Sequence, residues 1–433
     1  MIHDASLHEL LQKVWDGGRI DRADALRLYA LPLEELGALA DRRRQLHRAA
    51  AHGGRGNEIV TYIVDRNVNY TNVCNVYCKF CAFWRSEKDL DSYVISHDEM
   101  DRKIEETIAL GGNQILMQGG HHPKLTKQWY LDLLTHIRDK FPGFNVHGFS
   151  PSEMVAFSEF FNEPVEQILK DFVAAGLGSV PGGGGEILVD RVRNRIAPLK
   201  ADTAQWMGVM DTAHRLGLAS SITMMFGHVE TVEERIEHLE VVREQQDRSL
   251  ARLSSLAPTG GEGKGEGAGH GGMQHPLGNH AATPSPQPSP PVGAREKMPA
   301  PIARSVAYAH ALETGALQGG AFTAFICWTF QPENAVLKSP TVGAHEYLRT
   351  QALSRIYLDN VPSVQSSWVT QGLEIGQLAL RYGANDLGSI MIEENVVSAA
   401  GTTHRMSVAD MQRLITDLGL EPRPRDNWYR LLK

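Results

Sequence analysis

The sequence predicts an α/β protein: a (β/α)8 TIM-type barrel with an N-terminal helical extension and a low-complexity insertion. Eight apolar or β-branched runs alternate with charged helical segments over residues 57–400, as expected for parallel strands covered by helices. The expected strands are Ile59–Asn67, Gln114–Met117, Phe144–Phe149, Leu177–Val180, Ser220–Phe226, Phe322–Phe330, Ser363–Ser367 and Gly388–Ile392. The helices expected between them include His97–Ala109, Lys127–Lys140, Glu230–Gln245 and Gly343–Leu358. In such a barrel the C-terminal ends of the strands carry the active site.

The segments on either side of the barrel pattern, residues 1–56 and 401–433, are expected to be helical. In the first of them, one apolar face has residues at helical spacing: Leu7, Leu10, Leu11 and Val14. Asp21 is a candidate cap for a second helix. The arginines at 42–44 are expected on a solvated helix face rather than in a binding patch.

Residues 249–318 interrupt the barrel pattern. They include the Gly-rich run Gly260–Gly267 and the Pro-rich run Pro284–Pro291. Such a composition buries too little apolar surface to offset its conformational entropy. The sequence therefore predicts a disordered insertion in a surface loop, with a short helix at 303–312 where the chain returns. A lid or a partner-binding tail is the alternative.

Composition and charge set limits on the class of protein. The chain has 433 residues, of which 42% are hydrophobic and 22% charged, as in an ordinary globular enzyme. A formal net charge of -8 argues against nucleic acid or an anionic membrane as the main partner. No apolar run is long enough to cross a bilayer, and the first residues do not resemble a signal or transit peptide. We expect a cytoplasmic protein with reduced cysteines.

Three of the four cysteines, Cys74, Cys78 and Cys81, follow the first expected strand with the spacing C-x3-C-x2-C. Thiolates this close together bind a soft metal centre, and three of them would leave one iron of a 4Fe-4S cluster without a protein ligand. A zinc site is the alternative, but no fourth Cys or His follows at the usual spacing. Three unrelated thiols are the other alternative. Cys327 stands alone on a strand, where we expect it to pack as a small hydrophobe.

Glycine and polar residues mark the ends of the second and third expected strands. Gly119 and Gly120 would let a ligand approach the backbone closely, and His121 and His122 beside them are candidates for substrate contact or for filling the turn. At the third end, Ser150 and Glu153 are candidate ligand contacts. The alternative for Glu153 is that it begins a helix, where the dipole favours a carboxylate.

The fourth and fifth strand ends carry further candidates. Four consecutive glycines, Gly182–Gly185, precede Glu186 and form a cradle suited to an anion or a cofactor. Arg193 is the arginine we prefer for pairing a carboxylate in a forked geometry. After the fifth strand, His228 and Glu230 would lie at the barrel mouth, where His228 is a candidate proton acceptor or a hydrogen-bonded structural histidine.

Together these motifs resemble the radical S-adenosylmethionine (SAM) superfamily, and within it the cyclic dehypoxanthinyl futalosine synthase family. Its relatives are aminofutalosine synthase and the radical SAM subunits of FO synthase. The resemblance rests on Asn69–Cys74, Cys81–Phe83, Gln118–Pro123, Pro181–Arg193, Met224–Thr231, Thr329–Pro332 and Glu393–Gly401. There are two departures from the family pattern: Cys327 stands where a proline is expected, and the insertion at 249–318 is additional.

The resemblance implies roles for the candidate residues. Cys74, Cys78 and Cys81 would hold a 4Fe-4S cluster whose open iron chelates SAM. The implied cofactor contacts are Phe80, Gly119, Gly120, Ser150, Glu153, Glu186 and Arg193. Substrate contacts would come from His121 and His122, and catalytic roles would fall to His228 and Glu230. By position alone, the benzoate of the substrate would find donors among Ser366, Ser367, Thr402 and Thr403.

The resemblance also implies a reaction in the futalosine route to menaquinone. A 5′-deoxyadenosyl radical would take hydrogen from the ribose C4′ of dehypoxanthine futalosine, and the carbon radical would add to the benzoate ring. A flavodoxin or ferredoxin would supply the electron. Aminofutalosine synthase or an FO synthase-type enzyme is the alternative substrate class. An iron–sulfur redox sensor is the non-enzymatic alternative.

Overall fold

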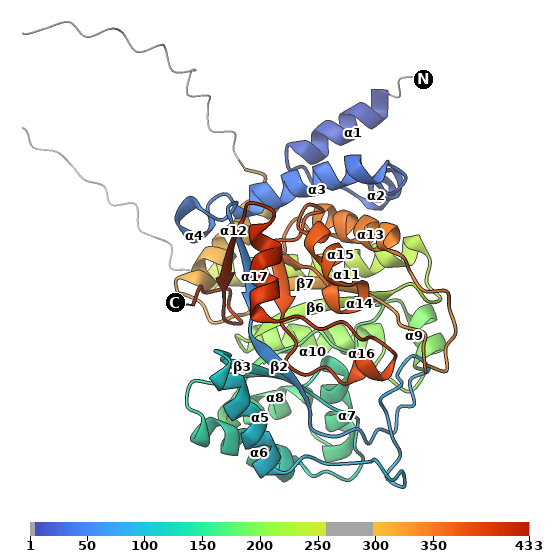
Figure 1. Ribbon diagram of the computed structural model, residues 1–433, viewed down its shortest axis with the longest axis vertical. Coiled ribbons are helices and arrows are strands. Elements are labelled where there is room, and N and C mark those ends of the chain that lie inside the picture. The colour runs from blue at the N-terminus through green and yellow to red at the C-terminus, as the bar shows by residue number, and fades with distance from the viewer. Residues whose placement is uncertain (1–4, 257–297, 433) are drawn as a thin grey trace, which may run out of the picture.

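The computed structural model describes residues 5–256 and 298–432, and these residues contain one parallel sheet of ten strands (Figure 1). The strands are β1 (Ile59–Ile63), β2 (Asp65–Asn69), β3 (Gln114–Gln118), β4 (Asn145–Gly148), β5 (Leu177–Val180), β6 (Ala219–Phe226), β7 (Phe322–Thr329), β8 (Ser363–Gln365), β9 (Asp386–Ser389) and β10 (Glu421–Pro424). Their order in the sheet is β10-β1-β9-β8-β7-β6-β5-β4-β3-β2. The predicted barrel fold is confirmed, with each expected strand present within a few residues of its predicted ends.

β2, at one end of this order, and β1, next to β10 at the other end, form one bent strand, because only Val64 separates them. The first half of this strand pairs with β9 and β10, and the second half pairs with β3. Two hydrogen bonds continue the pairing beyond β9. The Ile392 amide donates to the Asp65 carbonyl oxygen, and the Asn67 amide donates to the Glu393 carbonyl oxygen. The sheet therefore curls into a ring in which β1–β2 and β3 to β9 occupy eight positions, as in a TIM-type barrel.

Helices cover the outside of the ring, and most strands are followed along the chain by one or more of these helices. They are α5 (His97–Ala109), α6 (Lys127–Lys140), α7 (Pro151–Phe161), α8 (Val165–Ala175), α9 (Asp190–Ile196), α10 (Thr203–Arg215), α11 (Val232–Leu256), α12 (Ala300–Glu313), α13 (Ala344–Tyr357), α14 (Trp368–Gln371), α15 (Leu373–Ala379), α16 (Val396–Ala399) and α17 (Val408–Thr416). Their caps follow the sequence: Ser96, Thr126, Ser150, Asp202 and Ser407 each accept a hydrogen bond from a first-turn backbone amide.

The N-terminal segment forms α1 (Ala5–Trp15), α2 (Arg22–Tyr29), α3 (Leu33–Arg48) and α4 (Ala51–Gly54), which lie over one end of the barrel with α3 against α13 (Figure 1). Asp21 caps α2, as expected. The expectation of a solvated face at 42–44 is wrong for Arg43, which is fully buried, and for Arg44, which is also buried. Arg44 pairs with Asp41 on the same helix. Arg43 contacts backbone groups instead. Its guanidinium donates to the carbonyl oxygens of Gly17 and Gly18, so the charge satisfies backbone groups at the turn between α1 and α2.

The two described ends of the interval 249–318 are helical. Residues 249–256 continue α11, and α12 occupies much of the return segment, as expected for 303–312. Leu250 of α11 packs in a small buried cluster with Tyr308 and Leu312 of α12. This buried apolar contact explains why the expected insertion is too wide at both ends. Residues 257–297, which hold the Gly-rich and Pro-rich runs, lie outside the described residues.

The C-terminal segment, expected to be helical, contains a helix and a strand. After α17 the chain adds β10 at the edge of the sheet, parallel to β1. Pro422 and Pro424 lie in β10, where a missing backbone amide is tolerated because an edge strand pairs on one side only. Helical periodicity in α17 is visible in the sequence, whereas the pairing of β10 depends on the exposed side of β1.

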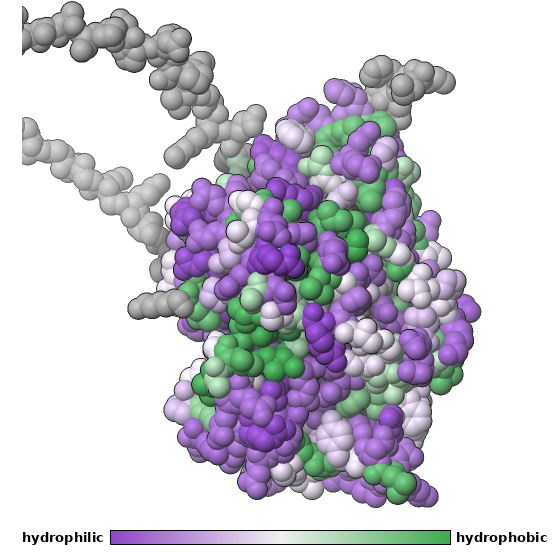
Figure 2. Space-filling view, viewed as in Figure 1, coloured by the Kyte–Doolittle hydropathy of each residue, from purple (hydrophilic) through white to green (hydrophobic). Residues whose placement is uncertain are grey.

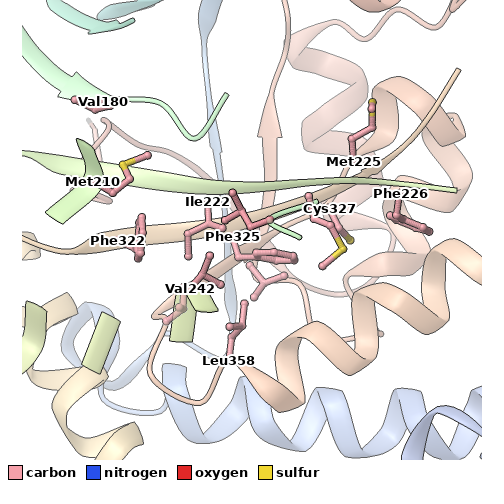
Figure 3. Packing of buried hydrophobic residues seen from close by; sticks show 14 of the residues in the cluster. Val180, Met210, Ile222, Met225, Phe226, Val242, Phe322, Phe325, Cys327 and Leu358 are labelled. Atoms are coloured by element: carbon pink, nitrogen blue, oxygen red, sulfur yellow. The ribbon is translucent and has the colours of Figure 1, made fainter. Parts of the chain in front are cut away.

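Apolar side chains from the strands and the surrounding helices form one large buried cluster (Figure 3). Cys327 of β7 lies in this cluster beside Phe325 and is fully buried. Its thiol donates to Oε1 of Gln351 at 3.0 Å, and burial raises the pKa of the thiol. The prediction that Cys327 packs as a small hydrophobe is confirmed, and the hydrogen bond to Gln351 satisfies its weak donor.

The face of the molecule drawn in Figure 2 is largely covered by hydrophilic side chains, with hydrophobic side chains in smaller groups among them. Such a mixture is normal for folded proteins. Within the described ranges, no helix is both long enough and apolar enough to span a membrane.

Buried histidines make the stability of this fold depend on pH. Burial lowers the pKa of His147, His214 and His238 to about 3 each, with nearby arginines adding to the effect. At a pH between the ordinary histidine pKa and about 3, these histidines are protonated in the unfolded chain but not in the folded chain. The free energy of unfolding should therefore fall as pH decreases below about 6.5, by roughly 1.4 kcal/mol per pH unit for each histidine.

Urea unfolding at about pH 7, 6 and 5 would test this expectation. His238→Gln is the matched variant, because glutamine can still accept the hydrogen bond from the Leu188 amide but does not titrate. Its pH dependence should be shallower than that of the unmodified protein by roughly the contribution of one histidine. Equal slopes in the two proteins would contradict this explanation.

Candidate active site

The loop that carries the three cysteines follows β2, at the C-terminal end of the barrel. It is held by bridges to its own second half: Thr71 pairs with Val94, and Val73 pairs with Arg85. Tyr77, between Cys74 and Cys78, has a φ of 53°, a left-handed conformation that is uncommon for a non-glycine residue. Strained backbone of this kind gathers at ligand-binding sites.

The three thiols of this loop lie near one another. Cys78 is buried, and Cys74 and Cys81 are half-buried. Burial raises the pKa of Cys78 to about 12, and negative charge on Cys81 and Cys74 acts in the same direction, whereas Lys200 opposes the shift. The Cys78 thiol is therefore protonated at neutral pH without a metal, and binding of a metal centre there would release its proton.

Residues around the thiols also suit a cluster and its ligand. Within the described residues, no three Cys, His, Asp or Glu side chains lie close enough together to hold a single metal ion. The fit therefore rests on three free thiols sharing one loop, on the glycine turn beside them and on a buried ammonium. Such a donor set is the soft, three-thiolate set of an iron–sulfur centre.

Lys200, which the sequence analysis did not select, supplies this ammonium. It lies in the loop between α9 and α10, where nothing in the local sequence distinguishes it. Its Nζ donates to Oε1 of Glu186 at 2.9 Å and lies 5.3 Å from the ring centre of Phe80. Although burial opposes it, the pKa of Lys200 is raised by Glu186 and by the Cys78 thiol, so the ammonium stays charged beside the cysteine loop.

The glycines at the end of β3 have no space for side chains. A Cβ on Gly119 would lie 2.6 Å from the Tyr70 ring, and one on Gly120 would lie 2.2 Å from the carbonyl oxygen of Val73. The turn is thus pressed against the cysteine loop. His121, next in the chain, is buried; burial and the charge on Lys200 lower its pKa to about 3, so its ring is neutral.

His122 and Glu153 serve the backbone of this region. Nδ1 of His122 accepts a hydrogen bond from the Lys124 amide. Glu153 is buried, and its carboxylate accepts four hydrogen bonds: from the Tyr70 hydroxyl, the Gly119 amide, the Ser150 amide and the Ser150 hydroxyl. A carboxylate has about four acceptor sites, so Glu153 has none left for a ligand.

This geometry favours the second interpretation of Glu153, in which it begins a helix. Ser150 and Glu153 form a capping box at the start of α7. The same carboxylate holds the Gly119 turn in place through its amide. The role that remains for the pair is to position the turn after β3 rather than to contact a cofactor directly.

Arg193 is likewise occupied by backbone. Its guanidinium donates to the carbonyl oxygens of Gly184, Gly185 and Ala201, and burial lowers the pKa of the side chain. The guanidinium, expected to bind a carboxylate, instead holds the glycine cradle after β5 by hydrogen bonds to its carbonyl oxygens. Its Nη1 lies 3.7 Å from Glu186, and this longer contact adds positive charge beside the cradle.

Glu186 lies between the cysteine loop and the barrel interior. Its φ of 35° places it in the left-handed region, and its carbonyl oxygen accepts a hydrogen bond from the Met225 amide. The carboxylate pairs with Lys200 on one side and lines the barrel cavity on the other. A strained backbone held in this way aims the side chain into the site.

His228 and Glu230 do not line the cavity. Nε2 of His228 donates to the carbonyl oxygen of Met225, and Nδ1 accepts from the Val229 amide. Glu230 accepts from the Gly227 and His228 amides and pairs with Arg235. Because both ring nitrogens are used and burial lowers the pKa of His228, the geometry supports the structural interpretation of this histidine over proton transfer.

The interior of the barrel holds a cavity of about 280 Å³, near the lower end of the range of small-molecule sites. Trp328 and Trp368 form part of its apolar wall, and Ser366 and Ser367 line it as expected. Thr402 and Thr403 are not among its lining residues. The cavity therefore accommodates a ligand that is partly aromatic and partly hydrogen-bonding.

Among the residues that the structure describes, the cavity wall contains no free cation. Among the lining residues, Arg425 is the one lysine or arginine, and it forms two hydrogen bonds to the carboxylate of Asp386, at 2.5 and 3.0 Å. Ser366 donates its hydroxyl to the Gly376 carbonyl, whereas the Ser367 hydroxyl lies 3.4 Å from that of Thr370. A ligand carboxylate in this cavity would be bound by neutral donors such as Ser367 and Thr370.

Comparison with known proteins agrees with this site. A family model described as the radical SAM superfamily matches residues 68–242, and one described as the CofH/MqnC C-terminal region matches residues 319–433. The barrel, the cysteine loop and these matches define a radical SAM enzyme. Enzymes of this superfamily use a 4Fe-4S cluster and SAM.

Full-length similarity identifies the family. The chain is 36% identical to the cyclic dehypoxanthine futalosine synthase of Halalkalibacterium halodurans, over 99% of the chain and 95% of that protein. It is 37% identical to the protein of the same name from Streptomyces coelicolor, over 100% of the chain and 90% of that protein. The chain therefore belongs to the radical SAM family that contains the cyclic dehypoxanthine futalosine synthases.

More distant matches extend this family. The aminodeoxyfutalosine synthase of Thermus thermophilus is 30% identical over 99% of the chain and 96% of that protein. Among solved structures, methylornithine synthase (PylB) matches with a TM-score of 0.58 at 14% identity, covering 95% of this chain and 97% of that one. The hydrogenase maturase HydG of Carboxydothermus hydrogenoformans matches with a TM-score of 0.61 at 13% identity, covering 98% and 81%. At these identities the two structures support the fold alone.

Replacing single cysteines should separate the site from the core. Cys74→Ala, Cys78→Ala and Cys81→Ala should each abolish cluster binding, because two thiolates cannot replace three. Cys327→Ala is the matched control and should retain iron, at a cost of about 1 kcal/mol in stability for the small cavity. Iron and sulfide per chain after anaerobic reconstitution, with circular dichroism for folding, would measure both effects. Full iron content in any of the first three variants would contradict the assignment.

Replacing His228 should weaken the fold more than the chemistry. His228→Gln loses at least one backbone hydrogen bond in the loop after β6, which should lower the free energy of unfolding by roughly 1–3 kcal/mol. The pH profile of turnover should keep its shape, because the ring is not available for proton transfer. Denaturant unfolding and rate measurements across pH would test this. A rate loss of about 100-fold or more without loss of stability would instead support catalysis by His228.

Proposed function

We propose that this protein converts dehypoxanthine futalosine to cyclic dehypoxanthinyl futalosine in the futalosine route to menaquinone. The observation that carries the proposal is the full-length similarity to two cyclic dehypoxanthine futalosine synthases, at 36% and 37% identity. When bound, the cluster and SAM would supply the one-electron chemistry that removes a hydrogen atom from the ribose. The chain's own residues would hold these groups, orient the substrate and exclude water.

The cluster side of the site is proposed to lie between the cysteine loop and the Glu186–Lys200 pair. Cys74, Cys78 and Cys81 would be the iron ligands. Gly119 and Gly120 would let SAM approach the backbone, with Phe80 beside its adenine. Support comes from the position of this turn, which packs against Val73 next to Cys74, and from the ammonium of Lys200, which would offset the negative charge of the thiolates.

A second group of residues is proposed to position these contacts. Glu153 would hold the Gly119 turn, and Ser150 would hold Glu153 by donating its amide and hydroxyl. Arg193 would keep the glycine cradle closed by binding its carbonyl oxygens. The neutral ring of His121 would face the space between the cluster and the substrate, with His122 fixing the same turn.

The substrate is proposed to occupy the barrel cavity, where it meets the cluster site at Glu186. Its aromatic ring would lie against the tryptophans of the wall, and its carboxylate would be bound by neutral donors including Ser367 and Thr370. The absence of an unpaired Lys or Arg among the lining residues supports this. The barrel encloses the site, which protects a reactive carbon radical from solvent.

The cellular setting is proposed to be cytoplasmic, with a flavodoxin or ferredoxin as electron donor. The unit that carries the chemistry would be the barrel, residues 57–400, with residues 1–56 and 401–433 as extensions. Conversion by an aminodeoxyfutalosine synthase reaction is the second candidate, favoured by the 30% identity to the Thermus thermophilus enzyme.

Anaerobic turnover of the reconstituted protein with SAM, dithionite and dehypoxanthine futalosine would test the proposal. The product should be about two mass units lighter than the substrate, because a hydrogen atom, a proton and an electron leave it. Substrate-dependent 5′-deoxyadenosine should appear with it, read by mass spectrometry. Protein treated identically but carrying Cys78→Ala is the control. An intact cluster with no change in this substrate would exclude the cyclisation and direct the same assay to the aminodeoxyfutalosine substrates.

A further inference from the structure

Three segments far apart in the sequence meet on the outer surface of the cysteine loop. The Lys79 amide donates to the carbonyl oxygen of Ile196 at the end of α9, and the Leu337 amide donates to the carbonyl oxygen of Lys79. Nζ of Lys79 donates to the carbonyl oxygen of Arg195. In Figure 1, α9 lies at the right edge, directly above the loop that follows β2. We call this surface, formed by residues 77–79, 195–199 and 336–338, the loop face.

Each segment of the loop face exposes one large apolar side chain. Tyr77 is 51% exposed, Leu199 is 65% exposed and Val336 is 71% exposed. Tyr77 is held in place by an edge-on contact with the Trp84 ring, at 4.9 Å between centroids. Isolated exposed apolar residues are ordinary, but these three lie on segments that hydrogen bonds at Lys79 join, so they add apolar area to one surface that a partner could cover.

Each segment also exposes a cation: Lys79, Arg195 or Lys338. In the part of the chain that the structure describes, none of the three pairs with a carboxylate. Two acidic residues of the same loop, by contrast, have cationic partners: Glu87 pairs with Lys124 and Asp91 pairs with Arg85, whereas Asp89 accepts a hydrogen bond from the Ser86 amide. The loop face is therefore basic on a chain whose net charge is -8.

The one acidic side chain that precedes Val336 in its segment does not cancel this charge. The Glu333 carboxylate lies against Gly401, where an added Cβ would be 2.2 Å from its Oε2. That contact is made with the turn after α16 rather than with α9. The basic, apolar character of the loop face is thus set by the three cations and the three apolar side chains.

The loop face lies directly outside the proposed cluster. Tyr77 and Lys79 are the chain neighbours of Cys78, and both are exposed. The buried Cys78 is therefore one residue away from the exposed surface on either side. The other cysteines of the loop are half-buried. A partner seated on this surface would come as near to the thiols as the fold allows.

We propose that the loop face is the docking site of a small acidic electron-carrier protein. This inference rests on the proposed radical SAM function, which requires the cluster to be reduced by one electron before SAM can be cleaved. The carrier's reduced flavin or iron–sulfur cofactor would be oxidised by one electron, and the cluster would be reduced by one. Opposite charge would steer the encounter, and the apolar side chains would form the small, weak contact typical of electron-transfer partners.

The test uses the full, reconstituted protein carrying Lys79→Glu, Arg195→Glu and Lys338→Glu together. Reduction of the cluster is followed by its absorbance, without substrate, after mixing with a reduced acidic flavodoxin or, separately, a reduced acidic ferredoxin. At low salt the second-order rate constant should fall by roughly 10- to 100-fold, and its salt dependence should flatten. Reduction by dithionite should change by less than about two-fold, because dithionite does not need this surface.

The matched control carries Arg138→Glu, Arg381→Glu and Arg413→Glu, which make the same change in net charge on exposed positions elsewhere. The carrier should reduce the cluster of this control variant with nearly the same rate constant as that of the unmodified protein. Equal losses in the two triple variants would show that only net charge matters and would overturn the proposal. An unchanged rate constant in the loop-face variant would overturn it too.

Two further variants keep the result interpretable. If the triple variant loses iron or fails to fold, Lys338→Glu and Leu199→Ser separately should each slow reduction by the carrier, without slowing dithionite; no effect of either would overturn the proposal. Because cluster reduction is measured without substrate, the loop face can be tested even if turnover of dehypoxanthine futalosine fails. If the protein turns over dehypoxanthine futalosine with dithionite, but the carrier reduces the cluster at the same rate in all variants, the proposed function stands and the docking site is rejected.

Discussion

The structure depends on one strand that pairs on both sides. Residues 59–69 bend at Val64, so that β1 completes the sheet against β9 while β2 begins it against β3. Because every strand is parallel, closing the ring brings all the strand ends that carry polar loops to a single mouth. The cysteine loop leaves from this closing strand. Its position therefore follows from the same pairing that forms the barrel.

At the mouth, each buried charge has specific hydrogen-bond partners. Lys200 donates to Glu186, and Arg193 donates to carbonyl oxygens of the glycine cradle. Glu153 accepts hydrogen bonds from four donors. Leaving any of these groups unpaired in a buried site would cost several kcal/mol. The positions of the glycine turn and the cradle are consequently fixed before any ligand binds, which lowers the cost of ordering them on binding.

Sequence reasoning selected candidate residues in the segments that follow the strands, but it did not predict the contacts that their polar atoms make. His228, Arg193 and Glu153 all belong to residue types that carry chemistry, and each follows a strand in the chain. In the folded chain, however, their polar atoms are taken by backbone groups from nearby loops. Lys200 shows the opposite case: an unremarkable lysine in a connecting loop becomes a buried ammonium beside the thiols. Hydrogen-bond partners of this kind are set by the loops' three-dimensional path, which local patterns do not record.

The barrel could be predicted from the sequence, because hydrophobic periodicity and strand–helix alternation are local properties of the chain. The sequence also determined the three-cysteine loop, since ligand spacing is a covalent property of the chain. Three-dimensional contacts, by contrast, set which polar side chains remain available to a ligand, how β10 extends the sheet, and that Tyr77, Leu199 and Val336 lie on segments joined at one surface. The last two depend on segments more than a hundred residues apart in the chain. The first depends on shorter separations, such as the 83 residues between Tyr70 and Glu153, but on loop paths that no local pattern records.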